Sequence, residues 1–214
     1  MQPRVAPDRA ERADNIAHSR PSARTGALRP WLLNLVAQLF VYLKQHDRAL
    51  RALEALLREY PDQPRAWSTA AFLYAEKDRM PEAIAAFERA LALQARDAAT
   101  LFNLGFVLQR VGRHEEALGR FQEALELQPN LDRAWYGMGL SLIQCGRFTE
   151  AVSRLQEAAR LQPLNPFARY QLAAAWFKLG EHEKVRAEYR RVKGFDPRVA
   201  EHIRIDFGVP KDPD

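Results

Sequence analysis

A period of 34 residues runs through most of this 214-residue chain and constrains its fold more than any other feature. Three residue types keep the period: Ala49, Ala83, Ala117 and Ala151; Pro61, Pro129, Pro163 and Pro197; and Gly112, Gly146 and Gly180. A repeat of this length is typical of a solenoid, in which each supersecondary unit buries its apolar face only by stacking on its neighbours.

The period divides the chain into five units, at residues 30–63, 64–97, 98–131, 132–165 and 166–199. Each unit has the apolar spacing of two amphipathic helices and is rich in good helix formers such as Ala, Leu and Glu. In the third unit a turn at Gly112 separates the two helices, and Pro129 ends the second because proline cannot continue a helix. No sustained alternation of β-branched residues occurs, so we predict an all-α solenoid of five helix hairpins.

Small residues also recur at the eighth position of each unit, where the set is Ala37, Ala71, Gly105, Gly139 and Ala173. We expect the two helices of a hairpin to approach each other closely at this position. A bulky side chain there would push the helices apart, at a cost of roughly 1–3 kcal/mol.

The repeat resembles the tetratricopeptide repeat (TPR), whose signature places Trp, Leu, Gly, Tyr, Ala, Phe, Ala and Pro at fixed positions. The matching residues are Ala49 and Pro61 in the first unit; Trp67, Tyr74, Ala83, Phe87 and Ala90 in the second; Leu104, Gly105, Ala117, Phe121, Ala124 and Pro129 in the third; Trp135, Gly139, Ala151, Ala158 and Pro163 in the fourth; and Leu172, Tyr189 and Pro197 in the fifth. Arg169 replaces Trp in the fifth unit. The resemblance implies a right-handed superhelix with atypical terminal units, and residues 200–214 as a C-terminal capping segment.

The resemblance also implies a binding groove, because the first helix of each TPR unit lines the concave face. Carried over by position, the groove residues are Arg65, Phe72, Phe102, Asn103, Phe106, Arg110, Arg133, Tyr136, Tyr170, Gln171 and Lys178, with Ser68, Thr69, Glu76, Gln109, Leu140, Ile143, Gln144, Phe167 and Phe177 beside them. Aromatic rings supply contact area and arginine pairs with carboxylates, so we predict a peptide ligand with acidic and apolar side chains. For Phe72 and Phe106, packing between neighbouring inner helices is the alternative.

A narrower binding mode of some TPR proteins is not indicated. These proteins hold the C-terminal carboxylate of chaperones in a clamp of Lys, Asn, Asn, Lys and Arg. In this chain only Asn103 and Arg133 match the clamp, because Ser68, Phe72 and Gly137 hold the other three places.

The N-terminal part of the chain differs from the repeats. Residues 1–29 are rich in Arg and poor in large apolar residues, so we predict a disordered tail, with a basic arm for an acidic partner or membrane as the alternative. Residues 31–43 are strongly apolar but too few to span a bilayer. We predict that they form a buried core helix; a membrane-surface helix and pairing with a second copy are the alternatives.

The sequence offers no motif for catalysis or metal binding. His46, His114 and His182 share one repeat position in alternate units, so the helix layers between them keep them from sharing an ion. The chain has no P-loop, G-x-S-x-G, CxxC or zincin pattern. Its one cysteine, Cys145, cannot form an internal disulfide, which fits a cytoplasmic location. We predict a protein that is not an enzyme and uses no cofactor.

Charge and repeat type together favour one class of partner. The net charge of +5 is modest, and a nucleic-acid binder is disfavoured because its basic residues should cluster. We therefore predict a scaffold or adaptor that binds another protein and has no small-molecule substrate. A chaperone for secreted or membrane-bound clients, a nucleic-acid binder and an accessory module for a separate enzyme are the alternatives.

Overall fold

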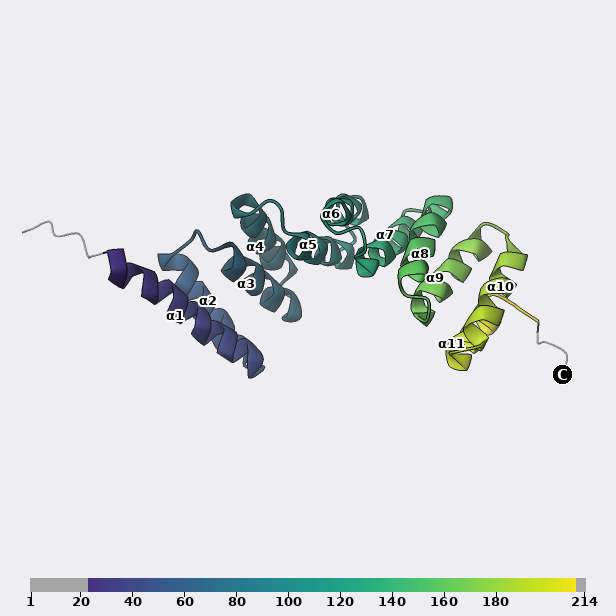
Figure 1. The fold of residues 1–214 in the computed structure, drawn as a ribbon. Helices are drawn as coiled ribbons and strands as arrows, with labels where there is room; N and C mark the ends of the chain where they lie inside the picture. The colour runs from purple at the N-terminus through teal and green to yellow at the C-terminus, as the bar shows by residue number, and fades with distance from the viewer. Residues whose placement is uncertain (1–22, 211–214) are drawn as a thin grey trace, which may run out of the picture. The chain divides into compact units, whose positions relative to one another are not determined.

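A computed structural model describes residues 23–210, which form eleven α-helices and no strand (Figure 1). The helix bounds are α1 Ala23–Tyr42, α2 His46–Glu59, α3 Pro64–Glu76, α4 Met80–Leu93, α5 Ala98–Arg110, α6 His114–Leu127, α7 Asp132–Gln144, α8 Phe148–Leu161, α9 Pro166–Lys178, α10 His182–Lys193 and α11 Pro197–Asp206. The first ten helices form five hairpins, from α1–α2 to α9–α10. The predicted all-α fold of helix hairpins is confirmed.

The hairpins belong to two compact units, Met1–Pro61 and Asp62–Asp214. The first unit contributes α1 and α2, which pack against each other. In the second unit the hairpins stack in chain order, with α4 against α5, α6 against α7 and α8 against α9. The first helices of neighbouring hairpins also touch, so α3, α5, α7 and α9 form a row within this unit.

The turn inside each hairpin explains why glycine keeps the period. Gly112, Gly146 and Gly180 have φ angles of 79°, 73° and 75°, in the left-handed region that glycine adopts without strain. Lys44 and Asp78 hold the same position in the first two hairpins, with φ angles of 55° and 59°. The left-handed conformation costs a residue with a Cβ atom roughly 1 kcal/mol, so hairpin packing imposes the turn even without glycine.

The buried ring of Phe121 in α6 explains the small residues of the first helices. A Cβ atom on Gly105 of α5 would lie 2.8 Å from this ring, and one on Gly137 of α7 would lie 2.7 Å from it. A Cβ atom on Gly139 would lie 2.5 Å from Leu155 of α8. These distances are well below van der Waals contact. The close approach predicted at the eighth position is therefore confirmed for Gly105 and Gly139.

The fifth hairpin replaces a tryptophan without losing its hydrogen bond. In the fourth hairpin the Trp135 indole N–H donates to the carbonyl oxygen of Pro129 at 2.9 Å. In the fifth, Nε of Arg169 donates to the equivalent carbonyl, that of Pro163, at 3.1 Å. Arg169 also forms an ion pair of 3.1 Å with the buried carboxylate of Glu188. The arginine thus takes over the tryptophan's backbone contact and adds a charge pair.

The last helix, α11, covers the end of the second unit. It begins at Pro197, inside the predicted fifth unit, because the Asp196 side chain caps it by accepting from the backbone N–H of Val199 at 3.1 Å. It packs against α9 and α10, and its Ile203 is fully buried. The chain ends its repeats with a helix that supplies apolar contacts to the last hairpin.

The first helix corrects two predictions. α1 begins at Ala23 and continues through Pro30, so residues 23–29 are helical, whereas a disordered tail was predicted over 1–29; residues 1–22 lie outside the described part. The prediction that residues 31–43 form a buried core helix is wrong for one side of α1. Only Ala37 is fully buried there, because α2 is its single partner helix within the first unit. In the described chain no helix has both the length and the apolar content to span a membrane.

Candidate functional site

A pocket of about 280 Å³ lies in the row of first helices, between α3, α5 and α7. Ten residues line it: Phe72, Ala75, Glu76, Phe87, Phe102, Asn103, Phe106, Val107, Arg110 and Arg133. Six of the eleven groove residues predicted from the sequence are among them, namely Phe72, Phe102, Asn103, Phe106, Arg110 and Arg133. The structure therefore brings together one predicted residue of the second repeat, four of the third and one of the fourth.

Aromatic rings give the pocket its apolar surface. Phe72 of α3 and Phe106 of α5 hold the same repeat position, and their side chains are 45% and 48% exposed. Phe102 lies one helical turn before Phe106, and its ring packs against Phe121 with centroids 5.8 Å apart. Phe102 is thereby anchored to the core, whereas Phe72 and Phe106 keep almost half of their surface open to a ligand.

Two arginines give the pocket its positive charge. Arg110 donates to the Ala75 carbonyl oxygen at 3.3 Å and to Asp78 Oδ1 at 3.2 Å, so the protein already occupies part of its guanidinium. The Arg133 guanidinium lies 5.0 Å from the centroid of the Phe102 ring. Within residues 23–210 no carboxylate forms an ion pair with Arg133, and its side chain is exposed. Arg133 is thus a positive group held beside an aromatic surface and open to an anionic ligand.

Four sequence profiles of the tetratricopeptide repeat match the chain, at residues 35–62, 62–130, 108–160 and 136–200. The protein belongs to the TPR family. A search of curated protein sequences gave no significant match.

Solved TPR structures share the fold. YrrB, described as a TPR protein with an unusual peptide-binding site, aligns with a TM-score of 0.76 at 24% identity, covering 86% of this chain and 98% of YrrB. MamA from Desulfovibrio magneticus RS-1 aligns with a TM-score of 0.75 at 18% identity, covering 78% of this chain and 95% of the MamA chain. At these identities the likeness concerns the fold alone.

Sequence reasoning missed the buried residues that line the pocket. Phe87, Ala75 and Val107 line it and are almost fully buried. Phe87 holds the Phe position of the TPR signature, which reads as core, so no signal in the sequence marks it as pocket-lining. These side chains therefore belong both to the TPR core and to the wall of the pocket.

Other predicted residues lie away from this pocket. Arg65 lines a smaller polar cavity of about 110 Å³ with Ser68, Asp97 and Thr100. The hydroxyls of Ser68 and Thr100 share a hydrogen bond of 2.8 Å across this TPR interface. Gln109 donates to the Gly137 carbonyl oxygen at 2.9 Å, so it holds α5 to α7 and is not open to a ligand.

Tyr136 and Gln171 join two TPR units. Burial raises the pKa of the half-buried Tyr136 phenol, and a hydrogen bond with Gln171 partly opposes that shift. The Tyr136 ring packs against Ala158, Ala159 and Ala168, which lie where α8 meets α9. These two predicted groove residues therefore belong mainly to the interface between hairpins.

Tyr170 is engaged by the C-terminal segment. Its hydroxyl donates to Oδ2 of Asp206 at 2.7 Å, and its ring lies 5.4 Å from that of Phe207 between centroids. The hydrogen bond to Asp206, helped by burial, raises the pKa of Tyr170 to about 12. Phe177 contacts the same Phe207 ring at 5.4 Å. The predicted groove surface of the last TPR unit is thus partly occupied by the chain itself, while Phe167 and Lys178 remain exposed.

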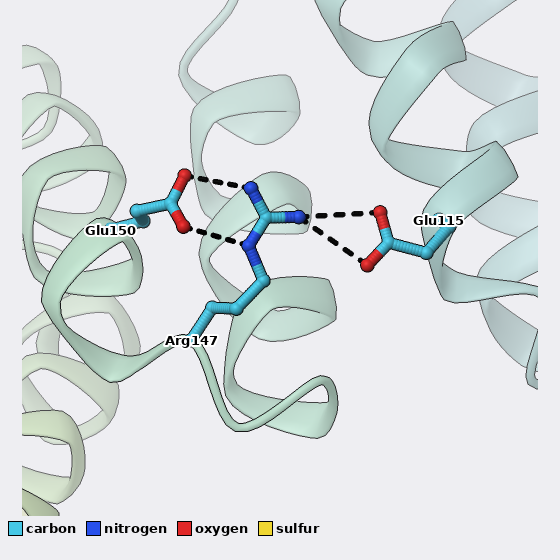
Figure 2. A network of polar contacts seen from close by, with 3 residues as sticks. All are labelled: Glu115, Arg147 and Glu150. Atoms are coloured by element: carbon cyan, nitrogen blue, oxygen red, sulfur yellow. Dashed lines mark hydrogen bonds and ion pairs between the residues drawn. The ribbon is translucent and has the colours of Figure 1, made fainter.

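Polar side chains outside the pocket form structural contacts. Arg147 pairs with Glu150 through two hydrogen bonds of 2.7 Å and with Glu115 of the preceding hairpin at 3.2 Å (Figure 2). Glu150 therefore has a lowered pKa. Nearby Cys145 has a raised pKa, from burial and from its hydrogen bond with Glu115, so its thiol stays protonated at neutral pH. Among the residues described, no group of His, Cys, Asp and Glu could hold a metal ion.

Proposed function

We propose that this TPR protein is a non-catalytic scaffold that binds a segment of another protein at the pocket between α3, α5 and α7. The observation that carries the proposal is the pairing of two half-exposed phenylalanines, Phe72 and Phe106, with the unpaired cation of Arg133. Aromatic anchors and arginines dominate the binding energy of many protein interfaces. The TPR fold itself, a protein-interaction scaffold in general, supports the same class of function.

The pocket's chemistry defines the ligand. Its volume of about 280 Å³ accommodates one or two side chains of a peptide, and its walls favour an aromatic or aliphatic anchor. Arg133 favours a carboxylate next to that anchor, because a guanidinium binds a carboxylate through two parallel hydrogen bonds. We therefore infer a peptide that carries Asp or Glu within a few residues of a large apolar side chain.

Catalysis is not part of this proposal. The Cys145 thiol is held in its protonated form, which is a poor nucleophile. The charged residues of the turns, such as Arg147, are engaged in ion pairs. An adaptor role in the cytoplasm stays a prediction from the repeat type and the single cysteine.

Selection from a displayed library of random twelve-residue peptides tests the proposal. We expect enriched peptides to combine Asp or Glu with Phe, Trp, Leu or Met. Their dissociation constants, measured by fluorescence anisotropy, should rise roughly tenfold or more in each of two variants. Phe106→Ala removes an apolar anchor, and Arg133→Glu removes a charge-assisted hydrogen bond of about 1.5–3 kcal/mol.

Matched controls separate the pocket from general surface effects. Leu164→Ala removes an apolar side chain that is 72% exposed, and Arg190→Glu reverses an exposed charge on α10. Both should bind the selected peptides as wild type does. Selection of basic peptides, or equal affinity in the pocket variants and the controls, would refute the proposed site.

A further inference from the structure

One face of the first helix carries seven exposed large apolar side chains, which we call the outer face of α1. Its members are Trp31, Leu32, Leu35, Val36, Leu39, Tyr42 and, directly after the helix, Leu43. Their exposed fractions run from 37% at Val36 to 83% at Tyr42. Residues 30–43 contain no charged residue. The face is a continuous apolar stripe, because its members are spaced by one, three and four residues along the helix.

Two members of the outer face occupy positions with which later hairpins stack. Leu32 and Leu39 are the third and tenth residues of their repeat. In the third, fourth and fifth repeats the residues at these two positions are buried. They are Thr100 and Val107, Ala134 and Ser141, and Ala168 and Ala175.

Specific contacts show that these positions face the preceding hairpin. Ala168 packs with Ala158 and Ala159 of α8. The Ser141 hydroxyl accepts a hydrogen bond of 2.8 Å from Gln109 of α5. Leu32 and Leu39 on the outer face of α1 therefore hold hairpin-stacking positions, and no earlier repeat precedes them in the described chain.

The chain's own ends are poor occupants of this surface. Residues 1–22 contain only three large apolar residues, Met1, Val5 and Ile16, which are too few to cover seven side chains. At the other end of the chain, α11 exposes Arg198, Glu201, His202 and Asp206. Docking that helix on an uncharged apolar face would take these polar groups out of water, and the apolar face offers them no hydrogen bond or counter-charge. A head-to-tail contact between copies is therefore disfavoured.

We propose that the outer face of α1 packs against the outer face of a second copy of this chain. The same surface is apolar and uncharged on both sides, so it is self-complementary, as a two-fold interface requires. An antiparallel pair sets the helix dipoles in opposition. It also brings Trp31 and Leu32 of one copy to Tyr42 and Leu43 of the other, with Leu35 of each opposite Leu39 of the other.

The size of the face sets the strength of the dimer. Seven partly exposed side chains on a helix segment about 20 Å long bury on the order of several hundred Å² per copy. A standard stable interface buries about 800 Å² per partner. The pair is consequently a concentration-dependent dimer, with dissociation expected in the micromolar range.

Sedimentation equilibrium of the full chain, from about 1 to 200 µM, tests the proposal. Wild type should move from the 24.5 kDa monomer towards twice that mass as concentration rises. The double variant Leu35→Glu/Leu39→Glu should stay monomeric throughout, with unchanged helix content by circular dichroism because both residues are exposed. The matched control, Leu164→Glu/Ile205→Glu, alters two exposed apolar residues elsewhere and should dimerise like wild type.

Cysteine cross-linking tests the antiparallel geometry in a Cys145→Ser background. Val36→Cys lies close to the two-fold axis and should form a disulfide with its copy under mild oxidation. Leu43→Cys should not, since the two copies of this position lie roughly 18 Å apart along the helices. Cross-linking at both positions overturns the antiparallel arrangement.

Two further outcomes would overturn the proposal as a whole. One is a wild-type monomer at every concentration, which would mean that the face is covered within the chain. The other is a monomer that co-sediments with phosphatidylcholine–phosphatidylserine vesicles and loses this binding in Leu35→Glu/Leu39→Glu. That result would assign the outer face of α1 to a lipid surface.

Discussion

The first hairpin, α1–α2, leaves six large apolar side chains of α1 and the following Leu43 exposed, whereas the last hairpin, α9–α10, is covered by α11. They are the first and the last hairpins of the described chain. At the C-terminal end Ala200 and Ile203 of α11, with Val209 after it, form a core with Val185 and Val192. The difference shows that the stacking surface of a repeat is apolar whether or not a neighbour covers it. A separate segment, such as α11, has to cover that surface where no further repeat follows.

The largest expected effect comes from breaking the C-terminal cap. Ile203→Asp places a carboxylate at a fully buried position between α11 and α10. We expect the free energy of unfolding to fall by about 3–5 kcal/mol, because the change removes apolar burial and leaves a charge without a partner. Urea denaturation followed by circular dichroism measures this loss.

The corresponding change in the first hairpin provides the control. Leu39→Asp introduces the same carboxylate at a position of α1 that is 53% exposed. At concentrations too low for self-association, it should change the free energy of unfolding by less than about 1 kcal/mol. Equal losses in the two variants would contradict the contrast between a covered and an uncovered end.

A smaller effect is expected at the ion pair of the last hairpin. Arg169 and Glu188 are mostly buried, whereas the first hairpin has Leu33 and Ala52 at the same two repeat positions. Arg169→Leu leaves Glu188 with Arg191 as its remaining partner, and should cost about 2–4 kcal/mol in urea denaturation.

The double variant Arg169→Leu/Glu188→Ala gives the last hairpin the same residue types that the first hairpin has at these two positions, Leu33 and Ala52. It should recover most of the lost stability, because an apolar pair replaces a buried charge pair at little net cost. If the double variant is no more stable than Arg169→Leu, the loss comes from the Pro163 hydrogen bond and not from the uncompensated carboxylate.

The smallest effect concerns pH and the contact between Tyr170 and α11. The Asp206 hydrogen bond raises the pKa of Tyr170 to about 12, above the ordinary value of 10.0. The folded state therefore favours the neutral phenol, so this contribution is complete below pH 10 and is lost as the pH rises towards 12. We expect it to be at or below about 1 kcal/mol, since the hydroxyl is partly exposed.

Comparing wild type with Tyr170→Phe isolates that contribution. The difference in free energy of unfolding between the two proteins should shrink between pH 10 and pH 12, as followed by urea denaturation. If the difference in free energy of unfolding does not change with pH, the Tyr170 hydroxyl does not stabilise the contact with α11.

Much of the repeat architecture follows from local sequence signals. The predicted unit starts at residues 64, 98, 132 and 166 coincide with the first residues of α3, α5, α7 and α9. These boundaries were predictable because proline, glycine and alanine act within a few residues of their own position. The gathering of Phe72, Phe106 and Arg133 in one pocket was also predictable, since their repeat positions share one helix face.

Other features required the tertiary structure. Phe87 of α4 holds a core position of the sequence pattern and is almost fully buried, yet it also lines the pocket between the first helices. Tyr170 and Phe177 were predicted to face an open groove, but Phe207 lies against both rings. Contacts of this kind depend on where a distant segment comes to lie.

The sequence by itself determined the helix hairpin, its 34-residue period, the turn at its fifteenth residue and the TPR family. These features rest on backbone conformation and on apolar spacing, which each repeat carries in full. Only the tertiary structure decided which end of the array is covered, how Arg169 replaces a tryptophan and which groove positions stay open. Those outcomes depend on contacts between segments far apart in the chain, and a repeated pattern does not distinguish a surface that has a neighbour from one that has none.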